Sequence, residues 1–506
     1  MTRRGQRRRR TAGGIRQLPW QQVTNPWSPL EVLSADQVEQ IIAAALTILE
    51  TTGFRFLDDE SRRRLEAAGA ESAGEDNMTR LDRAFVMENV ANVPERFTLR
   101  ARNPERNLTF GGNNIVFASV GGPAFVSDLD KGRRPGTYAE MCDYLRLVQS
   151  LNIIHQEAGG CFEPMDLPPE SRHLDLYHAQ LTLLDKNAQG YPLGRDRTID
   201  CIEMWCIALG VNREALADEP AILGIINTNS PMQLDVPMSE AVIELASLNQ
   251  VCCITPFTLA GSMSPATMAG TLAQQTAEVL AAATLTQVVR PGAPVMYGAF
   301  ASNVDMQSGA PALGTPEYAK MALASAQIAR RLGIPFRSSN TTTSNTADAQ
   351  AAYESQMSLW AAVLGHTHLV NHAAGWLEGG LTASFEKTVI DAEMLQMMPE
   401  TLKPIVVNDE ELALYAIDEV PPGGHHFGTA HTLERYETAF YATMLSSRQN
   451  FEAWQEQGST DAASRANTIW KQLVADYEQP PTDPAVLDAL NEYVERRKIE
   501  IAKKAN

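Results

Sequence analysis

The chain has 506 residues, of which 44% are hydrophobic and 20% are charged, a composition typical of a globular protein with one large domain and additions to it. Its 42 Lys and Arg residues against 61 Asp and Glu residues give a formal charge of -19, which argues against nucleic acid or an anionic membrane as the main partner. No segment approaches the roughly 18 consecutive apolar residues of a membrane helix. We therefore expect a cytoplasmic protein that is neither secreted nor inserted into a membrane.

The first 136 residues divide into three parts. The arginine-rich residues 1–17 are expected to form a disordered basic tail. Residues 34–94 then show apolar side chains at helical spacing. From 97 to 129 the chain changes to short apolar runs separated by Gly-Gly and Asn-Asn pairs, which mark turns between antiparallel strands. Residues 18–136 are thus predicted to form a helical cap with a small antiparallel sheet.

From residue 137 to 408, capped helices alternate with short apolar strands. Thr137 and Glu140 form a capping box, whereas Ser264-Pro265 and Thr315-Pro316 each place an N-cap before a proline at the first helical position. The strands are nearly continuously apolar, as parallel strands buried on both faces must be. They are residues 153–159, 187–193, 221–227, 252–257, 294–300, 334–339 and 368–374. The run from Pro404 to Val407 is the candidate for an eighth.

This alternation predicts a (β/α)₈ barrel of the TIM type, with an open doubly wound sheet as the alternative. No glycine motif for a dinucleotide or a nucleoside triphosphate follows any of the strands. Residues 409–506 are charged and helical. We expect them to form a C-terminal helical extension that wraps the barrel or a neighbouring subunit, and therefore expect a homo-oligomer.

The six cysteines are scattered and form no CxxC pair, which indicates reduced thiols rather than a disulfide framework. They are Cys142, Cys161, Cys201, Cys206, Cys252 and Cys253. The adjacent Cys252 and Cys253 lie in the apolar run VCCITPF, which is typical of a buried strand. We interpret them as buried thiols rather than as a redox pair.

A barrel of this type carries its reactive groups at the carboxyl ends of its strands. The predicted strand ends supply the candidate substrate-binding residues, which are Glu157, Tyr191, Phe257, Tyr297, Phe300, Arg337, His372 and Trp376. Aromatic faces attract cations, by roughly 2 kcal/mol or more where water is excluded, and they recognise quaternary ammonium groups. The pattern therefore favours a site for such a cation; the alternative is that the rings only fill the barrel.

The histidines, Arg337 and the lack of a nucleophile limit the reactions that the site could catalyse. His368 and His372 fall in a predicted strand, where residues i and i+4 lie about 13 Å apart, and no zinc-binding pattern accompanies them, so we expect no metal. Arg337 and His372 are interpreted as partners of a substrate carboxylate, with a core histidine as the alternative for His372. No nucleophile elbow is present, and Ser344 lacks an evident base. The attacking atom is therefore expected to come from another molecule.

Several longer motifs resemble a single family. They are SDLDKGRRPGT before the barrel, DAQAAYESQMSLW, HLVNHAAGWLEGGLTASFEK followed by IDAEML, and GGHHFGTAHTLERY near the end. From about Trp20 onward the chain resembles the trimethylamine methyltransferase family. Members that contain pyrrolysine carry it in the stretch similar to residues 336–349, which here holds only ordinary residues. The chain is thus similar to the non-pyrrolysine branch, which includes glycine betaine:corrinoid methyltransferases.

The resemblance implies a methyl transfer to an external acceptor. In that reaction the cob(I)alamin of a separate corrinoid protein attacks a methyl group of a small quaternary amine, glycine betaine above all, and a tertiary amine leaves. It implies a corrinoid partner protein, no cofactor held tightly by this chain, and a carboxylate-binding role for His372.

Three alternatives stay open at the level of the sequence. In the first, the substrate is another betaine, such as proline betaine, carnitine or a butyrobetaine. In the second, the chain is a binding protein that holds a quaternary amine without turning it over. In the third, the chain is an unrelated barrel lyase that uses Glu157 or Glu378 as its base.

Overall fold

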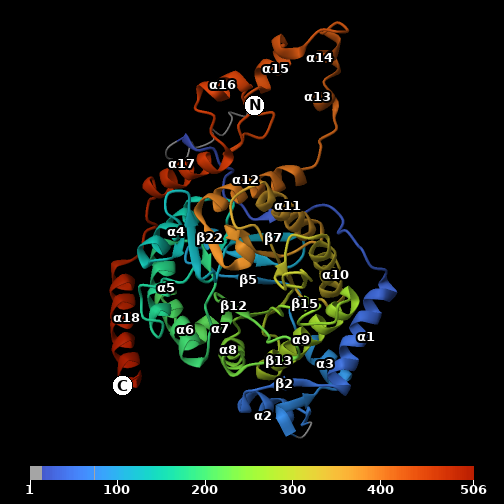
Figure 1. Cartoon of the computed structure of the whole chain (residues 1–506), viewed down its shortest axis with the longest axis vertical. Coiled ribbons are helices and arrows are strands. Elements are labelled where there is room, and N and C mark those ends of the chain that lie inside the picture. Colours follow the sequence, from blue (N-terminus) through green and yellow to red (C-terminus); the bar gives the residue numbers. More distant parts are fainter. Residues whose placement is uncertain (1–13, 73–74, 506) are drawn as a thin grey trace.

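A closed barrel of parallel strands forms the centre of the molecule (Figure 1). The computed structural model describes residues 14–72 and 75–505, and most of the expected basic tail lies outside the described residues. The barrel strands are β7 (Asn114–Ser119), β10 (Gln156–Glu157), β11 (Asn187–Ala188), β12 (Leu223–Ile226), β14 (Val251–Ile254), β16 (Val295–Gly298), β19 (Phe336–Ser339) and β20 (Leu369–Ala374). They pair in chain order, with β20 back on β7, and a parallel bridge between Gly190 and Gly224 joins β11 to β12. The prediction of a (β/α)₈ barrel is confirmed, and the open sheet is wrong.

The first strand of the barrel lies outside the predicted boundaries. The sequence pattern assigns residues 114–119 to the antiparallel sheet, but β7 pairs parallel to both β10 and β20. Five of its six residues are buried, as in a strand covered on both faces; the glycines and asparagines before it suggested a hairpin instead. The run from Pro404 to Val407 is not a strand, and Ile405 in it is 91% exposed.

Eight helices follow the strands and surround the barrel within the described part of the chain. They are α4 (Tyr138–Ser150), α5 (Arg172–Leu183), α6 (Arg195–Leu209), α8 (Val236–Ser247), α9 (Met268–Val289), α10 (Pro316–Leu332), α11 (Ala349–Leu364) and α12 (Phe385–Leu402). The capping box of Thr137 with Glu140 is present, and Thr315 caps α10 at Pro316. The prediction for α9 was three residues early, because Thr267 rather than Ser264 caps that helix.

Most of the residues before β7 pack on the side of the barrel, against α9 and α8, and one hairpin covers the amino ends of the strands. Helices α1 (Ala35–Thr51), α2 (Asp59–Ala67) and α3 (Arg83–Val90) accompany a small sheet that includes β2 (Phe54–Phe56) and β4 (Met78–Arg80). The hairpin of β5 (Phe97–Leu99) and β6 (Leu108–Phe110) packs its apolar side chains against the amino ends of the strands, in one cluster with Val116, Met296 and Leu369. The expected helices and the antiparallel hairpin are both present; the helices lie along the side of the barrel, and the hairpin covers the amino ends of the strands.

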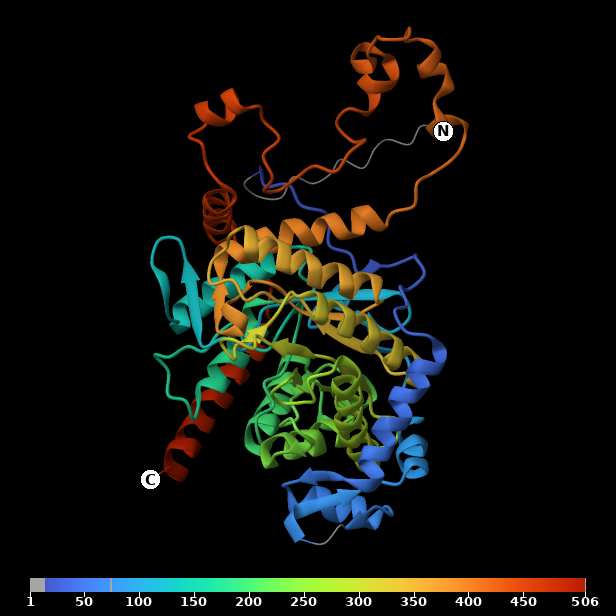
Figure 2. The same ribbon diagram turned by 45° about the vertical axis from the view of Figure 1, so that its right-hand side comes forward.

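The C-terminal extension is helical, as predicted. Helix α17 (Ala462–Ala475) packs on α4 and α12, and α18 (Pro484–Ala505) lies along α5 and α6. Between α12 and α17 the chain leaves the barrel, and the short helices α13 (Asp409–Leu412), α14 (Leu414–Asp418), α15 (Ala430–Arg435) and α16 (Phe451–Glu456) stand clear of it in both views (Figures 1 and 2).

Among the described residues, no helix combines the length and the apolar character needed to cross a bilayer.

Candidate active site

A cavity of about 560 Å³ opens at the carboxyl ends of the barrel strands. It is lined by glycines from the loops after β7, β10 and β11 and by larger side chains from the loop after β11 and from the other strands and their loops. Six of the eight predicted residues line it, and they are Tyr191, Phe257, Phe300, Arg337, His372 and Trp376. No lining residue among those described carries a carboxylate or a thiol. The cavity is therefore a set of aromatic faces and hydrogen-bond donors.

Arg337 is a buried cation at the floor of this cavity. It is 2% exposed, and its side chain donates to the carbonyl of Ala299 over 3.4 Å, while its Nε has no partner. No carboxylate in the described part of the chain pairs with the guanidinium. Burial lowers the pKa of Arg337 from its ordinary value, yet an arginine stays charged in a protein. A buried charge of this kind is stable only beside an anion.

His372 and Asn371 add two further donors next to the guanidinium. Nδ1 of His372 accepts a hydrogen bond from the backbone N–H of Gly121 over 3.2 Å, and a neutral ring that accepts at Nδ1 carries its proton on Nε2, where it faces the donor groups of Arg337. That Nε2 lies 3.3 Å from Nη2 of Arg337 and 3.5 Å from Nδ2 of Asn371. Burial and the charge of Arg337 hold the pKa of His372 well below its ordinary value. Three donors thus converge on one region, which is the arrangement that a carboxylate accepts from.

A chain of amides inside the barrel orients Asn371. Its Oδ1 accepts from Nε2 of Gln189 over 3.0 Å, and the same Nε2 donates to Gln156. Gln156 donates in turn to Asn187, whose amide donates to the carbonyl of Arg100. Because Oδ1 of Asn371 accepts the hydrogen bond from Gln189, the NH₂ group of Asn371 faces His372. The prediction from strand ends missed Asn371, although it stands one residue before His372 in the same strand.

The backbone of β20 is distorted where it presents His372. Between Val370 and Ala374 this strand advances four residues while β7 advances two, so the ladder contains a bulge. His372 lies inside it with a φ of +54°, a conformation that is uncommon for a residue with a side chain. Bulges redirect side chains at the rims of barrels, and strained residues cluster at functional sites. The distortion turns the imidazole toward the cavity.

Aromatic rings form a continuous wall beside the three donors. The rings of His372 and Trp376 are 4.5 Å apart between centroids, those of Phe300 and Trp376 are 5.9 Å apart, and those of Phe257 and Phe300 are 5.1 Å apart. The guanidinium of Arg337 lies 5.4 Å from the centre of the Phe300 ring. The aromatic wall therefore begins directly next to the donors of Arg337 and His372.

Two predicted residues, Tyr297 and Glu157, do not reach the cavity. Side chains alternate between the two faces of a strand, and Tyr297 points outward, where its hydroxyl lies 2.8 Å from that of Thr276 on α9. Glu157 is buried behind the cavity wall and accepts from the backbone N–H groups of Gly159 and Gly160. Burial raises the pKa of Glu157 to about 7. Glu157 shapes a loop that lines the cavity but faces away from it.

The loop after β19, which covers the stretch that differs from pyrrolysine-containing members, is held by Glu354 of α11. This carboxylate accepts from the side chain of Thr342, from the backbone and side chain of Thr343, and from the backbone of Ser344. The carbonyl of Thr342 in turn accepts from Nε1 of Trp376 over 3.1 Å. The motif DAQAAYESQMSLW therefore positions the aromatic wall through its glutamate.

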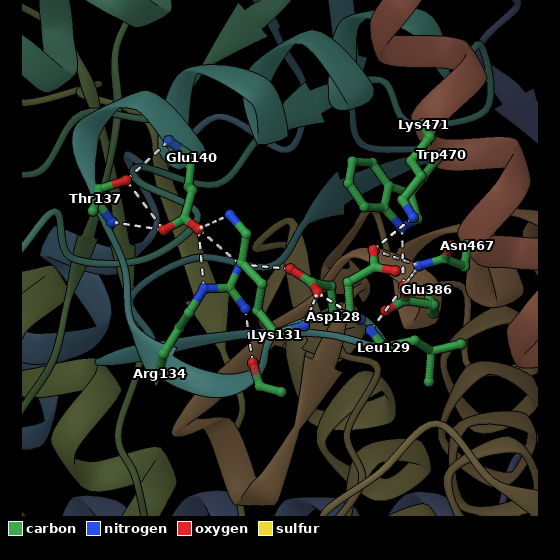
Figure 3. Close-up of polar contacts among 12 residues, drawn as sticks. Asp128, Leu129, Lys131, Arg134, Thr137, Glu140, Glu386, Asn467, Trp470 and Lys471 are labelled. Carbon is green, nitrogen blue, oxygen red and sulfur yellow. Dashed lines mark hydrogen bonds and ion pairs between the residues drawn. The ribbon is translucent and has the colours of Figure 1, made fainter.

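The motif SDLDKGRRPGT forms a rigid turn beside the mouth (Figure 3). Asp128 accepts from the backbone of Lys131 and from Arg134, and Arg134 also donates to Glu140 at the start of α4. The hairpin of β8 (Phe125–Asp128) and β9 (Gly132–Pro135) belongs to a sheet with β22 (Thr382–Ser384) and β21 (Trp376–Leu377). This sheet supports the backbone of Trp376.

Glu386 links the same turn to the C-terminal extension (Figure 3). It accepts from the backbone of Leu129 and from the side chains of Asn467 and Trp470 on α17. At the rim, Glu378 forms a two-pronged ion pair with Arg133, at 2.6 and 3.0 Å, and is not among the lining residues. Neither Glu378 nor Glu157 is therefore placed as the base of a lyase.

His368 and the cysteines occupy structural positions. His368 lies at the amino end of β20, where it bonds the backbone of Phe336 and Gly112. All six cysteines are buried and free; free thiols were predicted for all six, and burial for Cys252 and Cys253. Within residues 14–72 and 75–505, no group of three or more His, Cys, Asp or Glu side chains has the arrangement of a metal site.

Comparison with known proteins agrees with the motifs. A family model described as trimethylamine methyltransferase (MTTB) matches residues 1–502. A glycine betaine methyltransferase of Desulfitobacterium hafniense (strain Y51) is 34% identical over 471 residues, which cover 93% of this chain and 98% of that protein. A trimethylamine methyltransferase of Methanosarcina mazei is 25% identical over 488 residues, covering 92% and 95%. The solved monomethylamine methyltransferase of Methanosarcina barkeri aligns with a TM-score of 0.48 at 10% identity, covering 90% of this chain and 96% of that one.

The family model spans almost the entire chain, and one relative is about a third identical along nearly its full length. The prediction of a methyltransferase is confirmed at the level of the family. The chain belongs to the trimethylamine methyltransferase family.

Proposed function

We propose that this chain demethylates glycine betaine and passes the methyl group to cob(I)alamin carried by a separate corrinoid protein. The observation that carries the proposal is the buried Arg337, which lacks a carboxylate partner among the described residues and shares its surroundings with the donors of His372 and Asn371. Glycine betaine supplies the missing carboxylate and places a quaternary ammonium group one methylene carbon away from it.

The aromatic wall supports the ammonium half of the substrate. Trp376 and Phe300 lie next to His372 and Arg337, so a trimethylammonium group close to the carboxylate meets ring faces at once. Trimethylamine lacks the carboxylate and would leave the guanidinium unpaired. This reasoning favours a betaine over a simple amine.

The role of the protein in the reaction is to bind, orient and exclude water. The C–N bond to one methyl carbon breaks, its electron pair stays on nitrogen, and the two electrons for the new bond come from the attacking cobalt. The leaving group is dimethylglycine, which needs no proton at nitrogen to depart. The cavity lining accordingly offers faces and donors rather than an acid and base pair, and its contribution is proximity and desolvation.

A longer betaine, such as carnitine or a butyrobetaine, is the second candidate. The cavity volume of about 560 Å³ exceeds what glycine betaine fills, although part of that space must admit the attacking corrinoid. The short separation of donors and rings favours glycine betaine.

The reduced thiols suit the cytoplasm, and this location and a homo-oligomeric state are part of the proposal.

Isothermal titration calorimetry with glycine betaine, carnitine and trimethylamine tests the binding half of the proposal. We expect glycine betaine to bind most tightly and trimethylamine not to bind. Tight binding of trimethylamine would contradict a carboxylate site, and a preference for carnitine would select the second candidate.

The Trp376→Ala variant tests the aromatic wall. It is expected to weaken glycine betaine binding about 5- to 30-fold, since an ammonium group loses about 1–2 kcal/mol of interaction with a ring. Trp27→Ala is the matched control, because Trp27 is exposed and does not line the cavity. Equal affinities in both variants would remove Trp376 from the site.

A further inference from the structure

The segment that leaves the barrel between α12 and α17 presents a large apolar surface. We call residues 404–456 the arm; it stands clear of the barrel in both views (Figures 1 and 2). Its exposed apolar side chains include Ile405 at 91%, Phe440 at 84% and Phe427 at 79%, together with Val407, Tyr436 and Phe451. A protein in water does not leave such side chains uncovered without a partner.

The arm has a defined local structure and a fixed base. Asn408, Thr429 and Asn450 each cap a short helix through a side-chain oxygen. Where the arm returns to the barrel, Glu393 of α12 accepts from the backbone N–H groups of Met444 and Leu445, at 2.7 and 3.1 Å. These contacts hold the base of the arm while its tip lacks a core of its own.

The size of this surface calls for a permanent partner. Aromatic side chains bury roughly 150–250 Å² each, so the exposed apolar residues of the arm together present on the order of 1,000 Å². The largest apolar patch of a typical monomer is about 300–600 Å², and one side of a stable interface covers about 800 Å². The arm is therefore large enough to form a lasting interface.

The arm begins at the end of the barrel opposite the cavity mouth. The corrinoid has to reach the cavity, which opens at the carboxyl ends of the strands. Helix α12 begins after β20 on that side and runs back along the barrel, so the arm departs from its last residue, Leu402, at the opposite end. The chain returns from the arm to α17 beside the mouth, so the size of the exposed surface, rather than its position, favours a permanent partner over a protein that must come and go.

The same chain carries a second apolar surface that matches the arm. The outer faces of α11 and α12 expose Tyr353 at 62%, together with Met357 and Met397, where solvated barrel helices normally show polar residues. In both views the arm lies above these two helices and projects away from them (Figures 1 and 2). We propose that the arm of one copy packs on the α11–α12 flank of a second copy. A two-fold axis then covers both surfaces of both copies at once.

The molecular mass in solution tests this arrangement in the full-length chain. Light scattering after gel filtration is expected to give an even multiple of the 55.4 kDa chain. The triple variant Phe427→Ser, Tyr436→Ser, Phe440→Ser is expected to elute with half as many chains or fewer. The matched control is Leu129→Ser, Met306→Ser, Ile499→Ser, because these residues are exposed apolar side chains outside the arm, and it should keep the native mass. A monomeric native chain would overturn the proposal, as would an arm variant of unchanged mass.

Photo-crosslinking keeps the proposal testable if the triple variant aggregates. The photoreactive residue p-benzoylphenylalanine replaces Phe440 in an equal mixture of ¹⁴N- and ¹⁵N-labelled chains. We expect mixed-isotope peptides that join the arm to α11 or α12, and none when the probe replaces Ile499. Crosslinks confined to one copy, to another face, or formed only after a corrinoid protein is added would contradict the exchange of arms.

Discussion

Without a bound anion, the buried charge of Arg337 is expected to lower the stability of the folded protein. Its guanidinium is 2% exposed and lacks an ion-pair partner among the described residues, and a buried charge without a partner destabilises the fold. Residues that serve binding at the expense of stability are expected at functional sites. Stability and affinity should therefore respond in opposite directions when this charge is removed.

The Arg337→Met variant, of similar length but neutral, tests this opposition. We expect the free energy of unfolding without ligand to stay the same or to rise, and glycine betaine affinity to fall at least 100-fold, or about 2.7 kcal/mol. Urea denaturation and calorimetry measure the two quantities. The Arg96→Met variant, far from the cavity at the amino end of the barrel, is the control. A variant that loses stability yet keeps its affinity would assign Arg337 to the core.

The buried histidines His155 and His368 predict a loss of stability in acid. In both, Nδ1 accepts from a backbone N–H group, of Phe117 and Phe336, and Nε2 lies 3.0 Å from a carbonyl oxygen. Burial lowers the pKa of His155 to about 3 and that of His368 to about 4. Below the ordinary value of 6.5 the unfolded chain binds protons that the folded chain does not. This stabilisation is complete above pH 6.5 and is lost as the pH falls toward 4.

Each of these histidines should lower the free energy of unfolding by up to about 1.4 kcal/mol per pH unit below 6.5. Urea denaturation at pH 7, 6 and 5 measures the slope. The His368→Gln variant should flatten it, whereas His425→Gln, at an exposed position, should not. Equal slopes in all three proteins would refute the assignment.

Individual site residues were predictable where a residue lies at the carboxyl end of a strand and its side chain also points into the barrel. Phe300, Arg337 and His372 satisfy both conditions. Tyr297 does not, because one residue of register separates the cavity face from the helix face of β16, and a short apolar run does not reveal which face is which. Asn371 reaches the site through the bulge in β20, which no pattern in the sequence announces.

At the scale of elements, the backbone after β20 is shaped by a close approach at Gly375. Its N–H donates to Asp391 of α12 over 2.8 Å, and Lys387 pairs with the same carboxylate. Gly375 has a φ of +102°, and a Cβ there would lie 2.1 Å from the hydroxyl of Tyr144. The motif IDAEML thus positions the strand that carries Trp376, which explains its place in the family resemblance.

The Gly375→Ala variant is expected to lose about 2–4 kcal/mol of stability, because strain at positive φ adds to overpacking. It should also weaken glycine betaine binding by displacing Trp376. Gly210→Ala is the control for φ alone, since Gly210 has a φ of +65° and open space where a Cβ would stand. Thermal denaturation compares the two. Similar losses of stability in both variants would mean that the crowding around Gly375 does not contribute to the loss.

Elements were predictable where local chemistry marks them. Capping residues and apolar runs identified seven of the barrel strands and the start of α4 and α10. The strand β7 was missed because its flanking glycines and asparagines are the residues of hairpin turns, and only its pairing with β10 and β20 distinguishes it. Pairing between distant segments is a tertiary property that local patterns do not contain.

At the scale of the whole molecule, the barrel places a donor cluster and an aromatic wall at one end and a plugging hairpin at the other. Access to the cavity is therefore from the mouth alone, where the turn around Asp128 and the clamp of Glu386 on α17 stiffen the rim (Figure 3). The arm, in contrast, was expected to wrap the barrel or a neighbour. Its helices were predictable, but its departure from the barrel was not, and the proposed packing on a second copy would account for it.

Transfer of a methyl group to cobalt tests the proposed function most directly. Cob(I)alamin, free or bound to a corrinoid protein, is mixed with the chain and a panel of quaternary amines, and formation of methylcobalamin is followed by its absorption spectrum. We expect methylation with glycine betaine, none with the tertiary amine trimethylamine, which is added as a negative control, and a large loss in Arg337→Met. If no quaternary amine in the panel supports methylation, with either form of cob(I)alamin, the proposed catalytic activity is wrong.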